Sequence, residues 1–289
     1  MQPPIQEKLE EFYRLAHERQ LVWYRRQQGL QAPWTDDPVF REWKFTNVFR
    51  ELDAGTVFLI RMLEHDALGT GPADLVFNIW FYRELNNIES WSEVTEGRFV
   101  QPTEAVQRGL LGNMEARRLG GRPVFTNAHM APSYKAVAEA MPIVAKVSGA
   151  LARRLEKTSD LRDVYEHMRC LPAVSNFLAY QLAQDMTYAD PPLTAADTEE
   201  WALAGPGVLS ALETLYGRRV TPGEAVHCMK QIRDLQDEVF QRLGLEFSAV
   251  AHPKYARVGL SAVEHWLCEY TKYHRIAHEG GSGKIRYRA

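Results

Sequence analysis

Cysteine is scarce in this sequence, and no two cysteines lie close together. The 289 residues contain three, Cys170, Cys228 and Cys268, and none of them belongs to a CxxC pair. This pattern excludes a disulfide framework and a zinc knuckle built on cysteines, and it favours a reducing compartment. We therefore expect a cytoplasmic protein.

Long apolar runs are also missing. No window approaches the roughly 20 consecutive apolar residues that a membrane-spanning helix needs, so we expect no membrane partner. The stretch from Met1 to Arg14 carries charged side chains and no apolar run, so we expect no signal peptide.

A strong excess of charge of either sign is absent as well, since the formal net charge is -3 at pH 7. Nonspecific coating of nucleic acid depends on neutralising many phosphates, so this balance argues against a coating protein but does not exclude DNA as a substrate. With 45% hydrophobic and 25% charged residues, the composition is that of an ordinary globular protein. The length allows one large core or two small ones.

Helical periodicity, by contrast, runs along nearly the whole sequence. Apolar residues recur at spacings of three and four, and few segments alternate as strands do. The segments predicted as helices are 5–28, 57–68, 74–85, 102–111, 113–119, 134–155, 161–168, about 221–243 and 260–278. Residues 124–130 are left open as a short strand or a loop. We predict a mainly α fold and one helical domain over residues 1–289, in which 279–289 form a flexible tail.

Residues 33–53 combine a helix start with a polar pattern. Asp37 can accept hydrogen bonds from the free amides of a first turn, and Pro38 suits the first helical position. If the helix continues, one stripe holds Lys44, Asn47, Arg50 and Glu51, and the opposite stripe holds Phe45, Val48, Phe49 and Leu52. The polar stripe is either a solvated face or the wall of a binding site, and the spacing does not decide between them.

Two joints in the second half could bind an anion through backbone amides. Residues 171–179 have the outline of a helix-hairpin-helix, although Ala173 and Ser175 stand where glycines are expected. Residues 203–209 keep two glycines ahead of an apolar helix. A plain turn between helices is the alternative for this second joint.

The helix predicted over residues 260–278 has two distinct faces. On a wheel of about 100° per residue, the buried face holds Val263, Trp266, Leu267, Tyr270 and Tyr273, and another face holds Glu264, Cys268, Lys272 and Arg275. A carboxylate near a lysine and an arginine could act as a base beside phosphate-binding cations. The same set could equally be a row of surface ion pairs.

Two apparent ligand motifs fail on their context. Residues 280–284 have the letters of a Walker A loop, but no strand precedes them and Ile285 occupies the place of the magnesium-binding Ser or Thr. His274 and His278 have HxxxH spacing, but Arg275 replaces the glutamate of a zinc-protease motif and no third ligand is evident. We therefore predict no metal site.

The order of several motifs resembles that of a known family. The motifs are Pro33-Trp34-Thr35-x-Asp37, Lys44-Phe45-Thr46-Asn47-Val48-Phe49-Arg50-x-Leu52-Asp53, Tyr82-Arg83-x-x-Asn86, Phe177-x-Ala179-Tyr180-Gln181-x-x-x-Asp185, Gly205-Pro206-Gly207 and Glu264-x-x-Leu267-Cys268-Glu269-Tyr270-x-Lys272-Tyr273-x-Arg275. Together they resemble the α-glutamyl/putrescinyl thymine pyrophosphorylase family, which overlaps with the helical domain associated with 5-hydroxymethyluracil DNA kinases. The match covers nearly the whole chain.

The resemblance implies a helix-hairpin-helix, DNA-glycosylase-like fold and a part in thymine hypermodification of bacteriophage DNA. It implies a transferase that acts on 5-hydroxymethyluracil in DNA after its hydroxyl has been phosphorylated or pyrophosphorylated. An amine, such as an amino acid or putrescine, then replaces the phosphate group. Asn127-Ala128-His129 and Thr271 depart from the family's pattern, which puts the identity of the amine in question.

This chemistry assigns candidate roles to residues of the motifs. The incoming amine must lose a proton, and the candidate bases are Glu264, Glu269 and Asp185. The candidates for binding phosphate or DNA are Lys44, Asn47, Arg50, Arg83, Gly205, Gly207, Lys272 and Arg275. A target base must leave the duplex stack, and the candidates for its pocket are Trp34, Thr35, Asp37, Phe45 and Asp53. For each of these residues a structural role is the alternative.

The expected partners follow from the same resemblance. They are DNA with a modified thymine, a small amine or amino acid, and a separate DNA kinase, in the host cytoplasm if the protein is phage-encoded. We expect no resident cofactor and leave open whether magnesium assists. Two other functions stay open: a non-catalytic helical partner that positions DNA for a 5-hydroxymethyluracil DNA kinase, and a helix-hairpin-helix DNA glycosylase.

Overall fold

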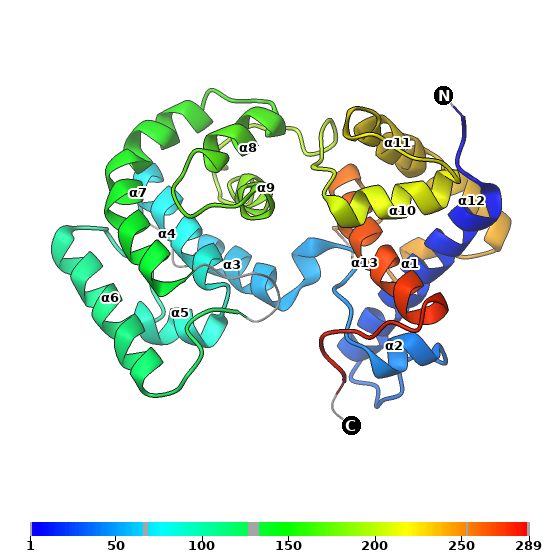
Figure 1. Ribbon diagram of the computed structural model, residues 1–289, viewed down its shortest axis with the longest axis horizontal. Helices are drawn as coiled ribbons and strands as arrows, with labels where there is room; N and C mark the ends of the chain where they lie inside the picture. Colours follow the sequence, from blue (N-terminus) through cyan, green and yellow to red (C-terminus); the bar gives the residue numbers. More distant parts are fainter. Residues whose placement is uncertain (1, 66–68, 127–132, 253, 288–289) are drawn as a thin grey trace. The chain divides into compact units, whose positions relative to one another are not determined.

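The secondary structure is helical throughout the described part of the chain. A computed structural model describes residues 2–65, 69–126, 133–252 and 254–287 (Figure 1). Its helices are α1 (Gln6–Gln27), α2 (Pro38–Glu42), η1 (Arg50–Leu52), α3 (Ala54–His65), α4 (Pro72–Leu85), α5 (Ile88–Val94), α6 (Glu104–Leu119), α7 (Tyr134–Leu155), α8 (Leu161–Arg169), α9 (Asn176–Asp185), α10 (Pro206–Tyr216), α11 (Pro222–Asp234), α12 (Gln236–Leu243), η2 (Phe247–Ala249) and α13 (Leu260–His278). The only β pairing within these ranges consists of isolated bridges, so the prediction of a mainly α protein is confirmed.

The helices gather into two compact units. Unit 1 comprises Met1–Asp53 and Glu199–Ala289, and unit 2 comprises Ala54–Thr198. Unit 1 is therefore built from two stretches that are distant in the sequence, whereas unit 2 is continuous. The prediction of a single helical domain did not specify this division, and it stays a prediction.

Unit 2 is built around α4. Every residue of α4 from Leu75 to Leu85 is buried, as expected for a helix that is apolar on all sides. It packs against α5, α7 and α9 (Figure 1). The helix starts with Pro72 in its first turn and ends at Asn86, which has a left-handed backbone (φ 41°). The predicted core helix over residues 74–85 is thus confirmed.

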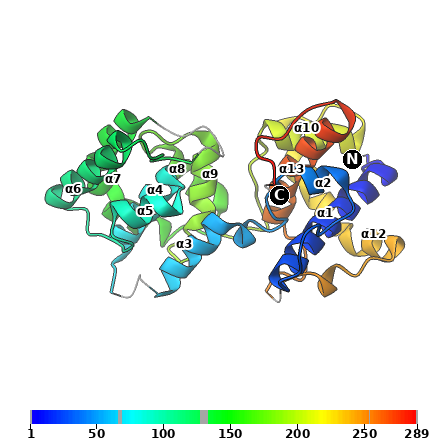
Figure 2. The ribbon, with the colours of Figure 1, turned by 90° about the horizontal axis from the view of Figure 1, so that it is seen from below.

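Unit 1 is built around α13. This helix packs against α1, α2, α10 and α11, and α12 packs against α1 (Figure 1). Figure 2 shows α1, α2, α10 and α13 from a second direction. The predicted bounds of α13 are confirmed, and four of the five residues expected on its buried face are buried, while Tyr273 is half-buried. The predicted first helix is confirmed as well, with Gly29 beyond its end at a φ of 69°.

The predicted helix beginning at Pro38 starts as expected but is much shorter. Asp37 caps α2 by accepting a hydrogen bond from Phe40 N, yet α2 ends at Glu42 and residues 43–49 are not helical. The prediction of two helical stripes was therefore wrong. Other partners take the backbone amides, because Lys44 N donates to Ile285 O (2.9 Å) and Asn47 N donates to the Asp53 carboxylate (2.8 Å).

Other helix boundaries differ from the prediction for two reasons. Glycines suggested a helix end where the helix continues, and one helix is interrupted where no glycine or proline marks it. The two helices expected over 102–111 and 113–119 are one helix, α6, which includes Gly109 and Gly112. The helix expected over 221–243 is interrupted at Leu235 into α11 and α12. Val124 to Thr126 do not form a strand, and the rest of that open segment, with Asn127, Ala128 and His129, lies outside the described residues.

The C-terminal segment makes backbone contacts with residues 42–44. Tyr287 N donates to Glu42 O (3.0 Å), and Arg286 forms an isolated bridge with Trp43. Gly283 lies so close to the Trp43 ring that an added Cβ would meet it at 2.7 Å. Residues expected to form a flexible tail thus pack on unit 1, although their flexibility stays a prediction.

None of the helices in the described ranges has the length and apolar character that crossing a membrane requires.

Candidate active site

Segment 43–53 lies against one face of α13, and both belong to unit 1. Thr46 N donates to Glu269 Oε2 (3.1 Å), and Lys272 Nζ donates to Lys44 O (2.8 Å). Further along the segment, Asp53 Oδ2 lies 3.1 Å from His265 Nε2. The structure therefore brings together residues from two motifs that are more than 200 positions apart (|i−j| = 212).

At the centre of this contact is a group that we call the acid–base cluster, which consists of Asn47, Arg50, Asp53, Glu264 and His265. Asp53 Oδ1 accepts from Asn47 N (2.8 Å) and Asn47 Nδ2 (3.0 Å). The other oxygen of Asp53 faces His265, so both carboxylate oxygens are engaged and the imidazole is fixed in place.

Arg19 of α1 is hydrogen-bonded to the cluster through Asn47. It is 3% exposed, although an arginine is seldom buried without partners. Its Nη2 donates to Asn47 Oδ1 (2.8 Å) and to Phe45 O (3.1 Å). A cation of α1 thereby fixes the backbone and the side chain of the segment that carries Asp53.

Burial raises the pKa of Glu264 to about 7, while the positive charges of His265 and Arg50 act in the opposite direction. The side chain belongs to a residue that is only 9% exposed, so loss of hydration disfavours its charged form. A carboxyl group with this pKa exchanges its proton near neutral pH. That property suits a general acid or base.

The neighbouring His265 is affected by burial and by its acidic neighbours. Burial lowers the pKa of His265, but the hydrogen bond to Asp53 and the charges of Asp53, Glu264 and Glu269 outweigh it, so the pKa is raised overall. His265 thus favours its imidazolium form beside Glu264. A charged imidazole next to a carboxyl near its midpoint can stabilise negative charge or relay a proton.

Glu269 and Lys272 form a second pair on α13. Lys272 Nζ lies 3.0 Å from Glu269 Oε2 and 4.2 Å from the centroid of the Phe45 ring. Glu269 also accepts from Thr46 N, so both charged groups bind segment 43–53 to the helix. The Lys44 side chain, in contrast, is exposed.

The remaining predicted phosphate ligands of unit 1 have other neighbours. Arg275 is exposed and donates to Ser282 O (3.1 Å). Gly205 precedes α10 as its N-cap, and a Cβ on Gly207 would lie 3.3 Å from Cys268 Sγ. Thr271 donates to Gly207 O (2.7 Å), so this turn packs closely on α13.

The predicted base-pocket residues divide into two groups. Phe45 is 3% exposed and packs against Phe40 and Tyr273, which makes it a core residue. Trp34 and Asp37 are partly exposed, and Asp37 accepts from Tyr273 OH (2.6 Å).

A cavity of about 340 Å³ opens beside Asp37. It is lined by Arg14, Leu15, Glu18, Arg25, Asp36 and Asp37. Thr35 reaches this group through its hydroxyl, which donates to Glu18 Oε1 (2.5 Å). Carboxylates and guanidinium groups thus share one small cavity.

Arg83 and Asp185 lie in unit 2 and bind each other. Arg83 Nε and Nη2 donate to the two oxygens of Asp185 at 2.7 and 2.9 Å, and Arg83 Nη1 donates to Asn86 Oδ1. The two side chains are 6% and 0% exposed. This geometry is that of a buried bidentate ion pair between α4 and α9. Both residues belong to unit 2, whereas α13 belongs to unit 1.

The segment predicted as a degraded hairpin joins α8 to α9, which pack together. Ala173 has a φ of 64°, a left-handed conformation that usually requires glycine. Ser175 caps α9 by accepting from Leu178 N. The turn therefore adopts the backbone of a glycine turn without the glycine.

The sequence analysis missed one residue of the acid–base cluster, His265, and one residue that contacts it, Arg19. Arg19 lies on the apolar face of α1 between Leu15 and Val22, and a charge at such a position was a readable signal. His265 directly follows Glu264, but its partner Asp53 is too distant in the sequence for spacing to reveal.

The fold and the site together define an α-helical protein with a partly buried carboxyl–imidazole cluster suited to proton transfer. The chain belongs to the family described as "5-hmdU DNA kinase, helical domain", whose model matches residues 6–283. It is similar to a 5-hmdU DNA kinase of Bacillus phage SP10, with 29% identity over 281 residues. That alignment covers 89% of this chain and 43% of the relative, so the chain spans less than half the relative's length. No solved structure matches the chain.

Proposed function

We propose that this chain takes part in thymine hypermodification of phage DNA and acts as a transferase on phosphorylated 5-hydroxymethyluracil. Family membership supports the pathway, because the family's description refers to 5-hmdU DNA kinase. The observation that carries the catalytic part is the acid–base cluster, in which Glu264 titrates near neutral pH beside His265.

In the proposed reaction the amine nitrogen attacks the exocyclic methylene carbon of the modified base. The bond between that carbon and the phosphate oxygen breaks, and the phosphate or pyrophosphate leaves with the electron pair. The attacking nitrogen loses its proton to the Glu264 carboxylate. His265 and Arg50 supply positive charge beside that carboxylate, which keeps part of its population ionised near neutral pH.

The exposed cations of unit 1 are proposed ligands of DNA phosphates, and Arg50, whose charge acts on Glu264, is the proposed cation for the leaving phosphate. Lys44 and Arg275 have exposed side chains, whereas Lys272 is engaged with Glu269 and Phe45. Arg83 is committed to Asp185, so we assign it a structural role. Fixed cations favour a leaving group on which negative charge develops.

The small cavity beside Asp37 is the proposed site for the amine. Its three carboxylates, from Glu18, Asp36 and Asp37, suit an ammonium group, and Arg14 and Arg25 suit a carboxylate. A cavity with both kinds of charge fits an amino acid better than a diamine such as putrescine. Asp37 is hydrogen-bonded to Tyr273 of α13, which lies nine residues beyond Glu264, so the amine must move from this cavity to Glu264 before it reacts.

For the DNA backbone we propose the hairpin between α8 and α9. Its left-handed turn at Ala173 and the start of α9 resemble the arrangement in which backbone amides approach a phosphate. This part of the proposal requires no base-specific contact.

A non-catalytic role has its own support. The matched family is described as the helical domain of a kinase, and the chain covers only 43% of its curated relative. In this alternative the chain positions DNA for a separate kinase, and the acid–base cluster only stabilises the packing of segment 43–53 on α13.

The test is to incubate the protein with DNA that carries phosphorylated or pyrophosphorylated 5-hydroxymethyluracil and with single amines, including amino acids and putrescine. Mass spectrometry of the nucleosides should show an amine adduct. Glu264→Gln should slow its formation by about 100-fold or more, because a general base typically contributes that much. The matched control is Glu213→Gln, which alters an exposed glutamate of α10 in the same unit.

Each other outcome supports a different function. Tight DNA binding without an adduct from any amine, together with stimulation of an added kinase, would replace the transferase by the positioning partner. Release of the free base would establish a glycosylase. Circular dichroism of both variants checks that the helices are retained.

A further inference from the structure

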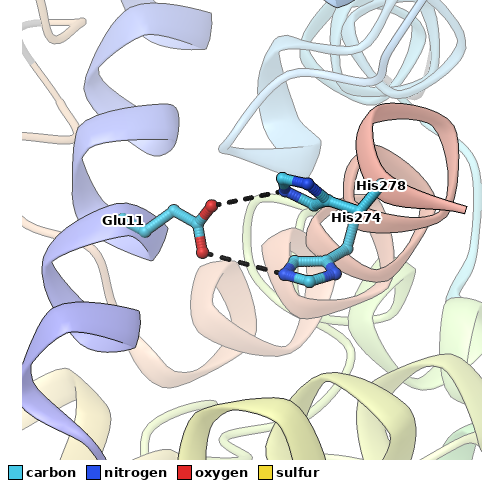
Figure 3. Close-up of side chains that lie close together, drawn as sticks. All are labelled: Glu11, His274 and His278. Carbon is cyan, nitrogen blue, oxygen red and sulfur yellow. Dashed lines mark ion pairs between the residues drawn. The ribbon is translucent and has the colours of Figure 1, made fainter.

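A carboxylate and two imidazoles meet where α1 lies beside α13, on residues that the proposed reaction does not use. Figure 3 shows Glu11 of α1 facing His274 and His278, which lie one turn apart on α13. Glu11 Oε2 lies 3.8 Å from His274 Nε2, and Glu11 Oε1 lies 3.7 Å from His278 Nε2. The sequence showed the histidine pair, but the third side chain comes from near the other end of the chain.

The spacing of these donor atoms approaches that of a metal site. One ligand atom from each of the three residues lies within 4.8 Å of the others. Around a tetrahedral Zn²⁺, with bonds of about 2.0–2.1 Å, ligand atoms lie roughly 3.4 Å apart. Small side-chain rotations would close the difference. The i, i+4 spacing directs both imidazoles to one side of α13, and their ring centroids are 4.4 Å apart.

His274 has a buried ring nitrogen that forms no hydrogen bond within the described residues. Its Nε2 atom is shielded from solvent and has no hydrogen-bond partner among those residues. A buried polar atom left without a partner costs roughly 1–3 kcal/mol, so such an atom usually serves a ligand, a water or an ion.

Both distances from Glu11 to the imidazole nitrogens are longer than a hydrogen bond, so the three side chains leave room between them for a ligand. Burial lowers the pKa of His274, and the charges of His278 and Lys8 lower it further, while Glu11 and Glu279 act in the opposite direction. A lowered pKa favours the neutral imidazole, which is the form that binds metals. Lys8 Nζ lies 3.6 Å from Glu11 Oε2 and is a competing cation at the edge of the cluster.

The carboxylate is also held in place by a further residue. Tyr270 OH donates to Glu11 Oε2 at 2.7 Å. Burial raises the pKa of Tyr270, and the hydrogen bond to Glu11 raises it further, so the phenol keeps the proton that it donates. Hydrogen bonds of this kind orient ligands in metal sites.

We propose that Glu11, His274 and His278 bind one divalent first-row transition metal ion, with Zn²⁺ as the best fit, and that the ion joins α1 to α13. Two imidazoles favour Zn²⁺ over Mg²⁺, which prefers oxygen ligands. His278 is 51% exposed at its side chain, so water can reach the remaining coordination position. His274 lies ten residues beyond Glu264, about 15 Å along the helix, so the site is separate from the acid–base cluster.

The test uses the full chain after removal of metals with a chelator. Calorimetric titration with Zn²⁺ should show one site, and Co²⁺ should give the visible absorption of a nitrogen- and oxygen-ligated ion. His278→Ala and Glu11→Gln should each weaken Zn²⁺ binding on the order of 100-fold, because even residues that only support a ligand contribute 10- to 100-fold. His227→Ala, which alters an exposed histidine of α11, should leave binding unchanged.

Thermal unfolding provides the second measurement. Zn²⁺ should raise the Tm of the unaltered chain and of His227→Ala but not that of His278→Ala, since the ion binds only the folded form. His278 is exposed, so His278→Ala should fold normally even if Glu11→Gln disturbs the hydrogen bond with Tyr270. Absence of a one-to-one complex, or equal affinity in all the variants, would overturn the proposal. Neither result bears on the transferase function, which involves different residues.

Discussion

Two buried glutamates show how their neighbours decide what a carboxyl group can do. Burial raises the pKa of both Glu264, to about 7, and Glu84, to about 8. The charges of His265 and Arg50 favour the ionised form of Glu264, so this carboxyl can change protonation near other ionisable groups. Among the described residues, the Trp80 indole alone acts in that direction on Glu84, which is buried on α4. We therefore assign chemistry to Glu264 and none to Glu84.

The isolation of Glu84 predicts an unusual dependence of stability on pH. Its usual pKa of 4.5 applies to the unfolded chain, and burial raises the pKa to about 8 in the folded one. The folded state therefore keeps the proton of Glu84 to a higher pH than the unfolded chain does. The contribution of Glu84 to the free energy of unfolding is complete below about pH 4.5 and is lost as the pH rises through about 8. Glu84→Gln should remove this loss, which makes the variant relatively more stable at about pH 9 than at about pH 5 by on the order of 2 kcal/mol or more.

Urea unfolding at a series of pH values measures this difference. The buried amide of the variant carries a cost of its own, but that cost does not vary with pH, so the slope and not the absolute stability is the readout. Glu213→Gln, at an exposed position of α10, serves as the control and should follow the unaltered chain. Parallel curves for Glu84→Gln and the unaltered chain would show that Glu84 does not have a raised pKa.

At the scale of elements, the turn between α8 and α9 carries strain that one substitution can relieve. Ala173 has a φ of 64°, which costs an L-residue roughly 1 kcal/mol or more but costs glycine little. Ala173→Gly should therefore stabilise the protein by roughly 0.5 kcal/mol, after the extra entropy of glycine in the unfolded chain is subtracted. Chemical unfolding gives the value directly.

A second alanine provides the matched comparison. Ala150 is exposed within α7, where glycine is less favourable than alanine by roughly 0.5–1 kcal/mol, so Ala150→Gly should destabilise the chain. The same substitution is thus expected to have opposite signs in the turn and in the helix. If Ala173→Gly destabilised as Ala150→Gly does, the turn would not hold a left-handed residue in solution.

The elements also show which features the sequence could predict. The helices α1, α4 and α13 follow from local periodicity, because each has a continuous apolar face or an apolar circumference. Segment 43–53 has the same spacing of apolar residues but not the helix, because Asp53 and Ile285 take its backbone amides. Those partners are chosen by tertiary packing, which overrides local preference.

The candidate site was predictable to the same extent. Glu264 could be proposed from the sequence because its chemistry and its helix are local features. Its setting was not predictable, because one of the charges that act on it comes from the distant Arg50, and the other, on His265, is held by a hydrogen bond to the equally distant Asp53. The metal cluster shows the same limit, since HxxxH is visible in the sequence whereas Glu11 approaches it only through the packing of α1 on α13. Hence sequence spacing reveals two side chains on one helix, such as His274 and His278, but only the folded structure shows that Glu11 lies beside them.

At the scale of the whole molecule, the division of the chain predicts how its parts fold. Unit 2 is one continuous stretch, and the helices that bury α4 all lie within it. The ion pair between Arg83 and Asp185 is also internal to this unit. A fragment of residues 54–198 should therefore fold alone, with a helical circular dichroism spectrum and a cooperative thermal transition.

A second fragment, residues 1–53, contains only the first stretch of unit 1 and should behave differently. The buried face of α1 packs on α12 and α13, which belong to the other stretch of unit 1, so this fragment lacks the partners for its apolar side chains. It should show little helix and no cooperative transition. The two fragments thus test one idea, that completeness of a core and not helical propensity decides whether a piece folds.

The pH dependence assigned to Glu84 makes the first of these tests sharper. If fragment 54–198 has the native core, its stability should fall as the pH rises toward about 8, and Glu84→Gln should abolish that fall in the fragment as in the full chain. A fragment that is helical but melts without cooperativity, or that lacks this pH dependence, would show that unit 2 needs unit 1 to complete its packing. The chain would then be a single domain in the energetic sense, as its sequence predicted.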